Sequence, residues 1–147
     1  MTDVFILSAA RTPIGGFGGS LSGLGPIDLA THVAKAAIAR AGVEAGQIGS
    51  SVFGHVLNTE PRDMYLSRVA AIEAGMAEGA VALNVNRLCG SGAQAIVSAA
   101  QMLMLGDCDM ALAGGAECMS RAPYILQAAR FGQKMGDTKA LDMIRAL

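Results

Sequence analysis

Four short apolar runs divide the chain, and each has the length and context of a strand. The first run, Val4–Ala10, is continuously apolar and stops before Arg-Thr-Pro, which is typical of a strand covered on both faces. The other three runs extend over Ser50–Leu57, Gly79–Val85 and Asp109–Glu117. The pattern therefore predicts four strands.

Helical periodicity lies between these strands. From Pro26 to Gly42 the chain has proline in the first turn and glycine after the end, and Asp28 lies near the positive end of the helix dipole. The apolar face of this helix is predicted to comprise Ile27, Ala30, Ala34 and Ile38. A second helix is predicted over Pro61–Gly75, with glycine at the position of a C-cap. One side of that helix is predicted to be lined by Tyr65, Val69, Ile72 and Met76.

A third helix is predicted after Cys89 and ends near Gly106. Strands that alternate with helices indicate an α/β layered domain with a mainly parallel sheet. From Ser120 onward the pattern weakens into a loop with a helical end. The last residues, LDMIRAL, lie within a helix-like pattern without a cap or polar tail, so we expect an interruption there rather than a natural end.

The composition is apolar for a soluble domain. Of 147 residues, 52% are hydrophobic and 16% are charged, and the mean hydropathy is +0.44. Such a chain buries its elements on several sides or leaves a face for a partner. The net charge is -1, and the sequence has no basic cluster, which argues against a nucleic-acid partner. The N-terminus lacks the basic region and cleavage pattern of a signal peptide.

The run from Leu88 to Gly106 carries no charge, which raises the question of a membrane span. It contains several glycines and also Ser91, Gln94, Ser98 and Gln101. A short bilayer helix rarely has so many amides and hydroxyls. We therefore expect a helix buried inside a protein and no membrane partner.

Most of the motifs tested fail. The glycine-rich loop after Pro13 has Leu21 where a dinucleotide fingerprint needs its third glycine. His32 and His55 have no metal-ligand partner at useful spacing, so we expect a surface or packed role for each. Three cysteines without a CxxC pair favour neither a disulfide framework nor zinc, and they favour a reducing cytoplasm. Of these three, Cys108 and Cys118 flank the fourth strand and are predicted to be structural.

Cys89 lies in the stretch NRLCGSG, between the end of a strand and the start of a helix. The unpaired amides and the positive end of the helix dipole favour a negative charge on the sulfur. The glycines leave room for a substrate carbonyl, and the amides would stabilise an oxyanion. These residues are equally compatible with a buried structural cysteine whose glycines allow close helix packing. On this reasoning Cys89 is either a nucleophile or a buried structural cysteine, and both alternatives remain open.

Three segments together resemble the thiolase family, the acetyl-CoA acetyltransferases and 3-ketoacyl-CoA thiolases. NRLCGSG with AQAIVSAAQ is similar to the family segment around the acyl-accepting cysteine, which implies that role for Cys89. GGAECMSRAPY, starting at Gly114, is similar to the family segment G-G-x-E-x-M-S, and RTPIGGFGGSL matches a third segment. FGHVLNTEPRDMYLSRVA is similar to the β-ketothiolase branch. The resemblance is collinear over essentially the whole chain.

The resemblance implies a thioester on the cysteine, formed from acyl-CoA, and then the formation or thiolytic cleavage of 3-ketoacyl-CoA. It implies acyl-CoA and CoA as the partners, no metal or other cofactor, and a homodimer or homotetramer. It also implies a five-stranded, mainly parallel sheet with helices on both faces. Residues 1–119 would form the N-terminal half of the fold, and residues 120–147 the truncated start of the family's loop domain.

The family's histidine base and second cysteine belong to a C-terminal half whose motifs this sequence lacks. Two other hypotheses stay open for this reason. One is a non-catalytic, isolated or split half that serves assembly. The other is a ketoacyl-synthase-type condensing enzyme, against which the G-G-x-E-x-M-S segment argues.

Overall fold

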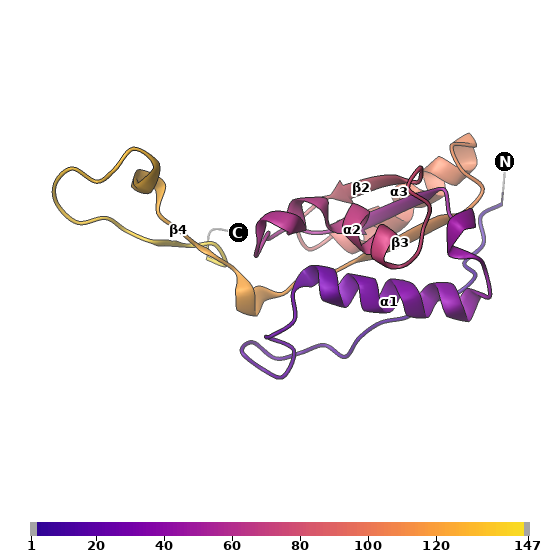
Figure 1. Ribbon diagram of the computed structural model, residues 1–147, viewed down its shortest axis with the longest axis horizontal. Helices are drawn as coiled ribbons and strands as arrows, with labels where there is room; N and C mark the ends of the chain where they lie inside the picture. The colour runs from indigo at the N-terminus through magenta and orange to yellow at the C-terminus, as the bar shows by residue number, and fades with distance from the viewer. Residues whose placement is uncertain (1–2, 146–147) are drawn as a thin grey trace.

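A computed structural model describes residues 3–145 of the chain, which are arranged around a parallel sheet (Figure 1). The sheet comprises β1 (Ser50–Gly54), β2 (Val81–Val85) and β3 (Ala111–Gly115) in the order β2-β1-β3. All of β1 is buried, as expected for a central parallel strand covered on both faces. Three of the predicted strands are thus confirmed, each with shorter bounds.

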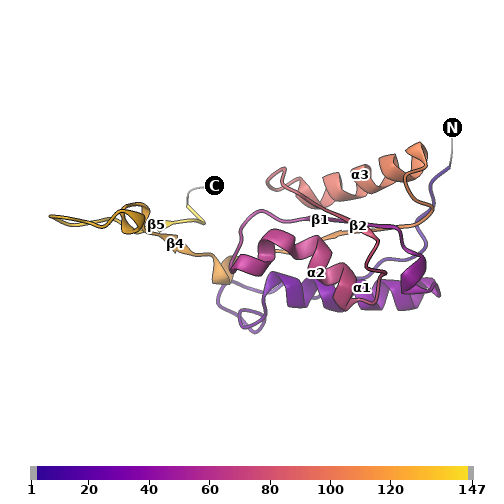
Figure 2. The same ribbon diagram turned by 45° about the horizontal axis from the view of Figure 1, so that its top comes forward.

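Helices cover both faces of this sheet, which confirms the predicted α/β layers. Figure 2 shows α1 (Pro26–Ala41) and α2 (Leu66–Glu73) on one face and α3 (Ser91–Leu105) on the other. Short 3-10 helices lie in the connections at η1 (Ala45–Gln47), η2 (Pro61–Tyr65), η3 (Met119–Arg121) and η4 (Gln127–Arg130).

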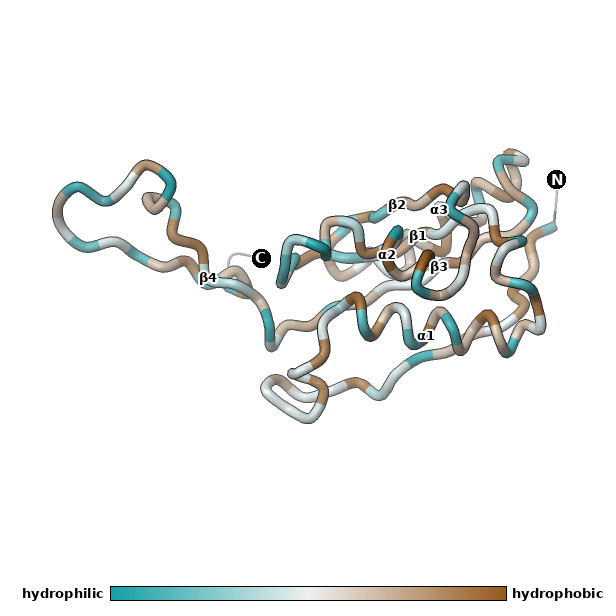
Figure 3. The backbone as a smooth tube through the Cα atoms, in the orientation of Figure 1, coloured by the Kyte–Doolittle hydropathy of each residue, from teal (hydrophilic) through white to brown (hydrophobic). Residues whose placement is uncertain are grey.

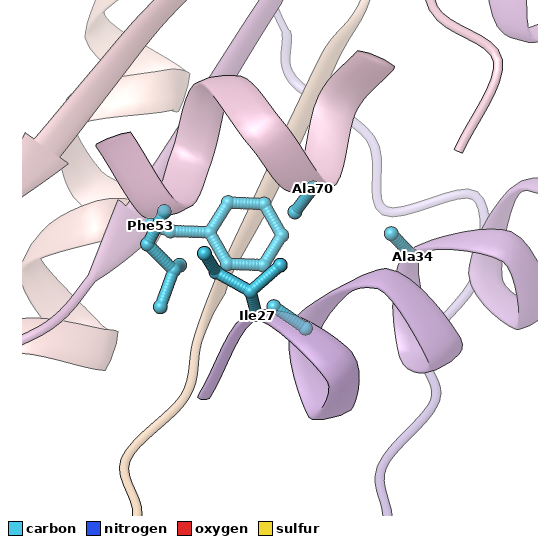
Figure 4. Close-up of a cluster of buried hydrophobic side chains, with 6 residues drawn as sticks. Ile27, Ala34, Phe53 and Ala70 are labelled. Atoms are coloured by element: carbon cyan, nitrogen blue, oxygen red, sulfur yellow. The ribbon is translucent and has the colours of Figure 1, made fainter. Parts of the chain in front are cut away.

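The core lies in two layers because side chains of β1 alternate between the two faces of the sheet. Phe53 packs toward α1 and α2, and in Figure 4 its ring lies between Ile27 and Ala70. Val52 packs on the opposite side against Ala95 and Ala99 of α3. Complete burial of a side chain the size of Phe53 contributes about 1.5–3 kcal/mol.

Local signals set the bounds of α1 as predicted. The amide of Gly25 donates to the Asp28 carboxylate at 3.0 Å, and Gly42 ends the helix at φ 68°. All four residues of the predicted apolar face are buried. Caps and periodicity act within one helix, so they could be read without knowledge of the rest of the fold.

The predicted second helix is partly wrong. Its first turn is the 3-10 helix η2, and α2 begins only at Leu66. The Asp63 carboxylate accepts hydrogen bonds from the amides of Thr59 and Glu60, which fixes this first turn. The break changes part of the buried face, although Met76 is buried and Val69 packs against the core as predicted. Tyr65 is 62% exposed and Ile72 is 39% exposed. The buried residues of α2 are Leu66, Ser67, Ala70 and Ala71.

The prediction of a buried first strand is wrong. Residues 4–10 are extended but lie outside the sheet, and Phe5 and Ile6 are 77% and 82% exposed. This N-terminal segment is attached to α1 by Ser8, whose hydroxyl donates to the Ala37 carbonyl at 2.7 Å. A cavity of about 1300 Å³ is lined by residues of this segment and by β3. An apolar run becomes a strand only where another strand edge pairs with it. Within residues 3–145 this segment pairs with no strand, although β3, an edge strand, lines the same cavity.

The predicted five-stranded sheet is therefore wrong for the described residues, because the main sheet has three strands. The other two short strands, β4 (Tyr124–Ile125) and β5 (Leu141–Asp142), pair with each other in an antiparallel ribbon. This ribbon belongs to an arm that extends away from the layers (Figure 1).

The predicted helical end is also wrong. Gly132 and Gly136 have positive φ angles of 78° and 80° in the loop that joins β4 to β5. Leu141 lies in the ribbon, and the Asp142 carboxylate accepts the Ile144 amide in a turn. Residues 146 and 147 of the predicted helical pattern lie outside the described part.

The uncharged helix α3 is less buried than predicted. Its buried side consists of Ser91, Ala95 and Ala99, while Ile96 and Leu105 are 54% and 78% exposed. By length and composition, Leu88–Leu105 could cross a membrane, and only 17% of it is buried. Its contacts with β1 and β3 place it on a sheet face instead. Figure 3 shows that apolar residues also continue into the C-terminal arm.

Candidate functional site

The candidate site is the loop between β2 and α3, at the carboxyl edge of the sheet. The three strands end in register, since Gly54 is paired with Val85 and Gly115. Cys89 follows the end of β2 by four residues and directly precedes Gly90, the N-cap of α3. Its side chain is exposed. The predicted position between strand and helix is confirmed, and Cys89 is not buried among residues 3–145.

The backbone of this loop is strained and tightly held. Leu88 has φ 51°, and no other non-glycine residue within 3–145 has a positive φ. This left-handed conformation costs a residue other than glycine about 1–2 kcal/mol. The Leu88 amide donates to the Asn86 side-chain oxygen at 3.0 Å. The Leu88 carbonyl accepts the Ser91 hydroxyl at 2.6 Å and the Ser91 amide at 3.0 Å.

The first turn of α3 gives the site its electrostatic character. Amides in the first turn of a helix, here including those of Gly92 and Ala93, have no preceding helical carbonyl to bind. The helix dipole adds a partial positive charge at the same end. Together these groups favour a negatively charged oxygen close to the loop, such as one that develops during a reaction.

The glycine at the end of β1 lets the first turn of α3 lie directly on the sheet, and a second glycine ends β3 beside it. A β-carbon on Gly54 would lie 2.6 Å from the Ser91 carbonyl carbon and 2.7 Å from the Gly92 nitrogen. A β-carbon on Gly115 would lie 3.1 Å from the Gly54 carbonyl oxygen. Sequence reasoning missed these two residues. The available signal was a glycine inside each of two predicted strands, Ser50–Leu57 and Asp109–Glu117.

A second polar cluster lies at the same sheet edge. The buried His55 ring contacts the Ala116 carbonyl through Nδ1 at 2.9 Å, and Nδ1 lies 3.3 Å from the Glu117 carboxylate. The same carboxylate accepts the amides of Val56 and Leu57, each at 3.0 Å. This arrangement joins the ends of β1 and β3. It confirms a packed role for His55, whereas His32 is exposed on α1.

The other two cysteines differ from Cys89. Cys118 is buried, as predicted, and Cys108 is half-buried just before β3, at the opposite edge of the sheet. Burial raises the pKa of the Cys108 thiol, and the carboxylates of Asp107 and Asp109 raise it further, against the opposing hydrogen bond from the Met110 backbone. Cys108 is therefore kept as a neutral thiol.

The remaining candidates do not form a site. Between residues 3 and 145, no three His, Cys, Asp or Glu side chains are grouped so that they could hold a metal ion. The glycine-rich loop folds into turns, and the Gly18 amide donates to the Ser120 hydroxyl. The cavity beside the N-terminal segment includes Glu117 and Cys118 in its wall, but Cys89 is not among the described residues that line it.

Comparison with known proteins gives consistent matches. The family model described as thiolase, N-terminal domain, matches residues 4–147. Beta-ketothiolase BktB of Cupriavidus necator is 56% identical over 142 residues, which are 97% of this chain and 36% of that protein. An acetyl-CoA acetyltransferase of the same bacterium is 45% identical over the same shares.

Solved structures match in the same way. Human mitochondrial 3-ketoacyl-CoA thiolase superposes with a TM-score of 0.92 at 38% identity, over 95% of this chain and 36% of that one. The structure of this enzyme in complex with CoA gives a TM-score of 0.91 at 39% identity, over 94% and 35% of the two chains. The chain thus spans about a third of the length of the relatives that it matches.

Proposed function

Because the chain belongs to the thiolase family, whose N-terminal domain it carries, we propose that it is the nucleophile-bearing part of an acyl-CoA C-acyltransferase. Its substrates are coenzyme A thioesters, and it needs no metal or other cofactor. The observation that carries this proposal is Cys89, exposed on the β2–α3 loop beside the first turn of α3.

In the first step the Cys89 thiolate attacks the carbonyl carbon of an acyl-CoA thioester. A new C–S bond forms, and the charge that develops on the carbonyl oxygen is stabilised by nearby amides. The bond from carbon to the CoA sulfur then breaks, and CoA leaves as a thiolate that takes up the proton which the Cys89 thiol gave up. The acyl group is left on Cys89 as a thioester.

In the second step the enolate of an acetyl-CoA attacks the acyl-enzyme carbon. The C–S bond to Cys89 breaks, and 3-ketoacyl-CoA is released. In the opposite direction CoA cleaves 3-ketoacyl-CoA. The base that forms the enolate belongs, in this proposal, to the C-terminal part of the protein. Cys108 is unsuited to proton transfer with Cys89 because it lies at the opposite edge of the sheet and its pKa is raised.

The proposal extends to the rest of the protein. Relatives are nearly three times as long as this chain, and the exposed apolar residues of α3 and of the N-terminal segment would be covered by the remaining polypeptide. We divide the chain into residues 1–119, which form the layered half, and residues 120–147, which begin a loop domain. We further propose a homodimer or homotetramer in the cytoplasm, where three free cysteines would stay reduced.

The test is acyl transfer to the full-length protein. Incubation with labelled acetyl-CoA should leave one labile acetyl group on the peptide that carries Cys89, as read by mass spectrometry. Cys89→Ala should abolish the labelling, and the matched variant Cys108→Ala should retain it. Acetylation that persists in Cys89→Ala, or that occurs on another residue, would refute the assignment.

A non-catalytic half that serves assembly is the alternative that the exposed apolar surface favours. It predicts that the full-length protein binds other copies or chains but acquires no acetyl group on Cys89. The same labelling experiment therefore separates the two functions.

A further inference from the structure

We propose that Ser91, assisted by Asn86, is a positioning residue that holds the backbone on either side of Leu88 and so fixes the direction in which Cys89 presents its sulfur. This inference rests on the proposed function, because it assumes that Cys89 is the acyl acceptor. Ser91 is 5% exposed, so its side chain is unsuited to contact the substrate directly.

The Ser91 hydroxyl makes two hydrogen bonds to the loop before it. It accepts the Arg87 amide at 2.8 Å and donates to the Leu88 carbonyl at 2.6 Å. The Asn86 side-chain oxygen holds the intervening Leu88 amide at 3.0 Å. Two consecutive amides and one carbonyl are thus bound by two side chains. This is the support that a left-handed leucine at φ 51° requires to persist.

The carbonyl of Leu88 is the link to Cys89. The Leu88 carbonyl, the Cys89 amide and the Cys89 Cα belong to one planar peptide group. A fixed carbonyl therefore also fixes the orientation of that amide and the position of the Cα that carries the Cys89 side chain. Loss of the hydroxyl would leave this carbonyl bound to the Ser91 amide at 3.0 Å and would free the Arg87 amide, so the peptide would be held less firmly against rotation toward the ordinary right-handed region of Leu88. The sulfur would then move relative to the first turn of α3.

Ser91 is itself held by the sheet beneath it. Gly54 leaves no side chain between β1 and the first turn of α3, and a β-carbon there would lie 2.8 Å from the Ser91 Cβ. Ser91 is itself buried, so a larger side chain at this position would need its neighbours to move. Serine is the smallest residue that carries a hydroxyl, so it satisfies both the space and the hydrogen bonds.

The consequence for the reaction is a loss of rate without a loss of binding. Acyl transfer requires the sulfur and the carbonyl carbon to be held in an attack geometry, and a misplacement of about 1 Å can cost about a hundredfold in rate. In the full-length enzyme, Ser91→Ala is expected to lower kcat about ten- to a hundredfold, with KM changed by less than about twofold. Asn86→Ala, at an exposed position, is expected to lower kcat several-fold with the same pattern.

The matched control is Ser98→Ala, which also removes a serine hydroxyl from α3. The Ser98 hydroxyl accepts the Gln94 side-chain amide at 3.2 Å and lies about two turns along α3 from Ser91. This variant is expected to keep the kcat of the parent enzyme. Thermal unfolding of all variants shows whether a lower kcat is caused by a less stable fold instead.

The outcomes separate the inference from the function on which it rests. If the parent enzyme acquires no acetyl group on Cys89, the proposed function fails. If Cys89 is acetylated but Ser91→Ala keeps the parent kcat, or raises KM alone, or loses no more than Ser98→Ala, the inference fails by itself. If Ser91→Ala does not fold, Asn86→Ala decides: a lowered kcat at unchanged KM supports the inference, and an unchanged kcat overturns it.

Discussion

At the scale of single residues, the surroundings of the three cysteines account for their different chemistry better than residue type does. Cys89 is exposed beside a helix start, Cys118 is buried, and Cys108 lies between two carboxylates. The sequence could predict a special cysteine at position 89, because the motif and the strand–helix junction are local. It could not predict the Ser91 hydrogen bonds, which depend on a left-handed Leu88 that no residue preference indicates.

The raised pKa of Cys108 predicts slow alkylation at that site. At a given pH below the pKa of an ordinary thiol, a smaller fraction of a thiol with a raised pKa is present as thiolate. The thiolate is the form that reacts with an alkylating agent. Iodoacetamide should therefore label Cys89 before Cys108, and labelling of Cys108 should increase only at more alkaline pH. Peptide mass spectrometry over a pH series measures both, and labelling of Cys108 at the rate of Cys89 would contradict the prediction.

The same shift predicts a dependence of stability on pH. At a pH above the pKa of an ordinary thiol, Cys108 is ionised in the unfolded chain but keeps its proton in the folded protein. The stability that this group contributes at lower pH is therefore lost as the pH rises. Cys108→Ala should therefore show a smaller loss of stability at alkaline pH than the parent. Urea unfolding of the full-length protein at several pH values checks this, and parallel pH profiles would count against it.

The close contact at Gly54 predicts a steric cost. Gly54→Ala places a β-carbon 2.6 Å from the backbone of Ser91, so the first turn of α3 must shift. We expect a loss of about 1–3 kcal/mol in the free energy of unfolding, measured by urea denaturation. Gly46→Ala is the matched control, because a β-carbon at Gly46 meets nothing within 4 Å. Equal stability of the two variants would show that the contact relaxes freely.

At the scale of elements, the predictions that succeeded used local signals and those that failed needed distant partners. The bounds and buried face of α1 follow from its caps and its periodicity. The face of α2 was misjudged because Asp63 and Asn84 hold η2 and the start of α2, and Asn84 comes from β2. The apolar Val4–Ala10 was misjudged because strand formation depends on a pairing edge that the run itself does not specify.

The link between the ends of β1 and β3 gives a prediction at this scale. Glu117→Ala removes the acceptor for the amides of Val56 and Leu57. Because hydrogen bonds to a charged group are the stronger kind, we expect a loss of about 1–3 kcal/mol and faster hydrogen exchange at these two amides. Glu78→Ala, at an exposed position, serves as the control. Unchanged exchange at Val56 and Leu57 would show that the carboxylate does not protect them.

At the scale of the whole molecule, the high apolar content is explained by surface as well as by core. Large apolar side chains are exposed on α3, on the N-terminal segment and on the C-terminal arm. A soluble monomer rarely leaves so many apolar groups uncovered. The composition alone allowed either burial on several sides or a face left for a partner, and the fold was needed to show that apolar residues are exposed and where they lie.

The 147-residue chain by itself is therefore expected to associate and to lack thiolysis activity. Size-exclusion chromatography should show large species at micromolar concentration, and cleavage of acetoacetyl-CoA should be absent. The full-length protein in the same buffer is the control and should be both discrete in size and active. A soluble, active monomer of 147 residues would overturn the proposal that the remaining polypeptide is needed.

The register of the sheet has a consequence for synthesis of the protein on the ribosome. Ser50 in the central strand pairs with Val81 and with Ala111, so β1 has only part of its partners until β3 has been made. At about 5–20 residues per second, the apolar segments of the first half stay uncovered for several seconds while the chain emerges. Chaperones that hold nascent chains would bind during this interval, and the exposed faces of α3 and of the N-terminal segment would remain open to them after β3 has paired.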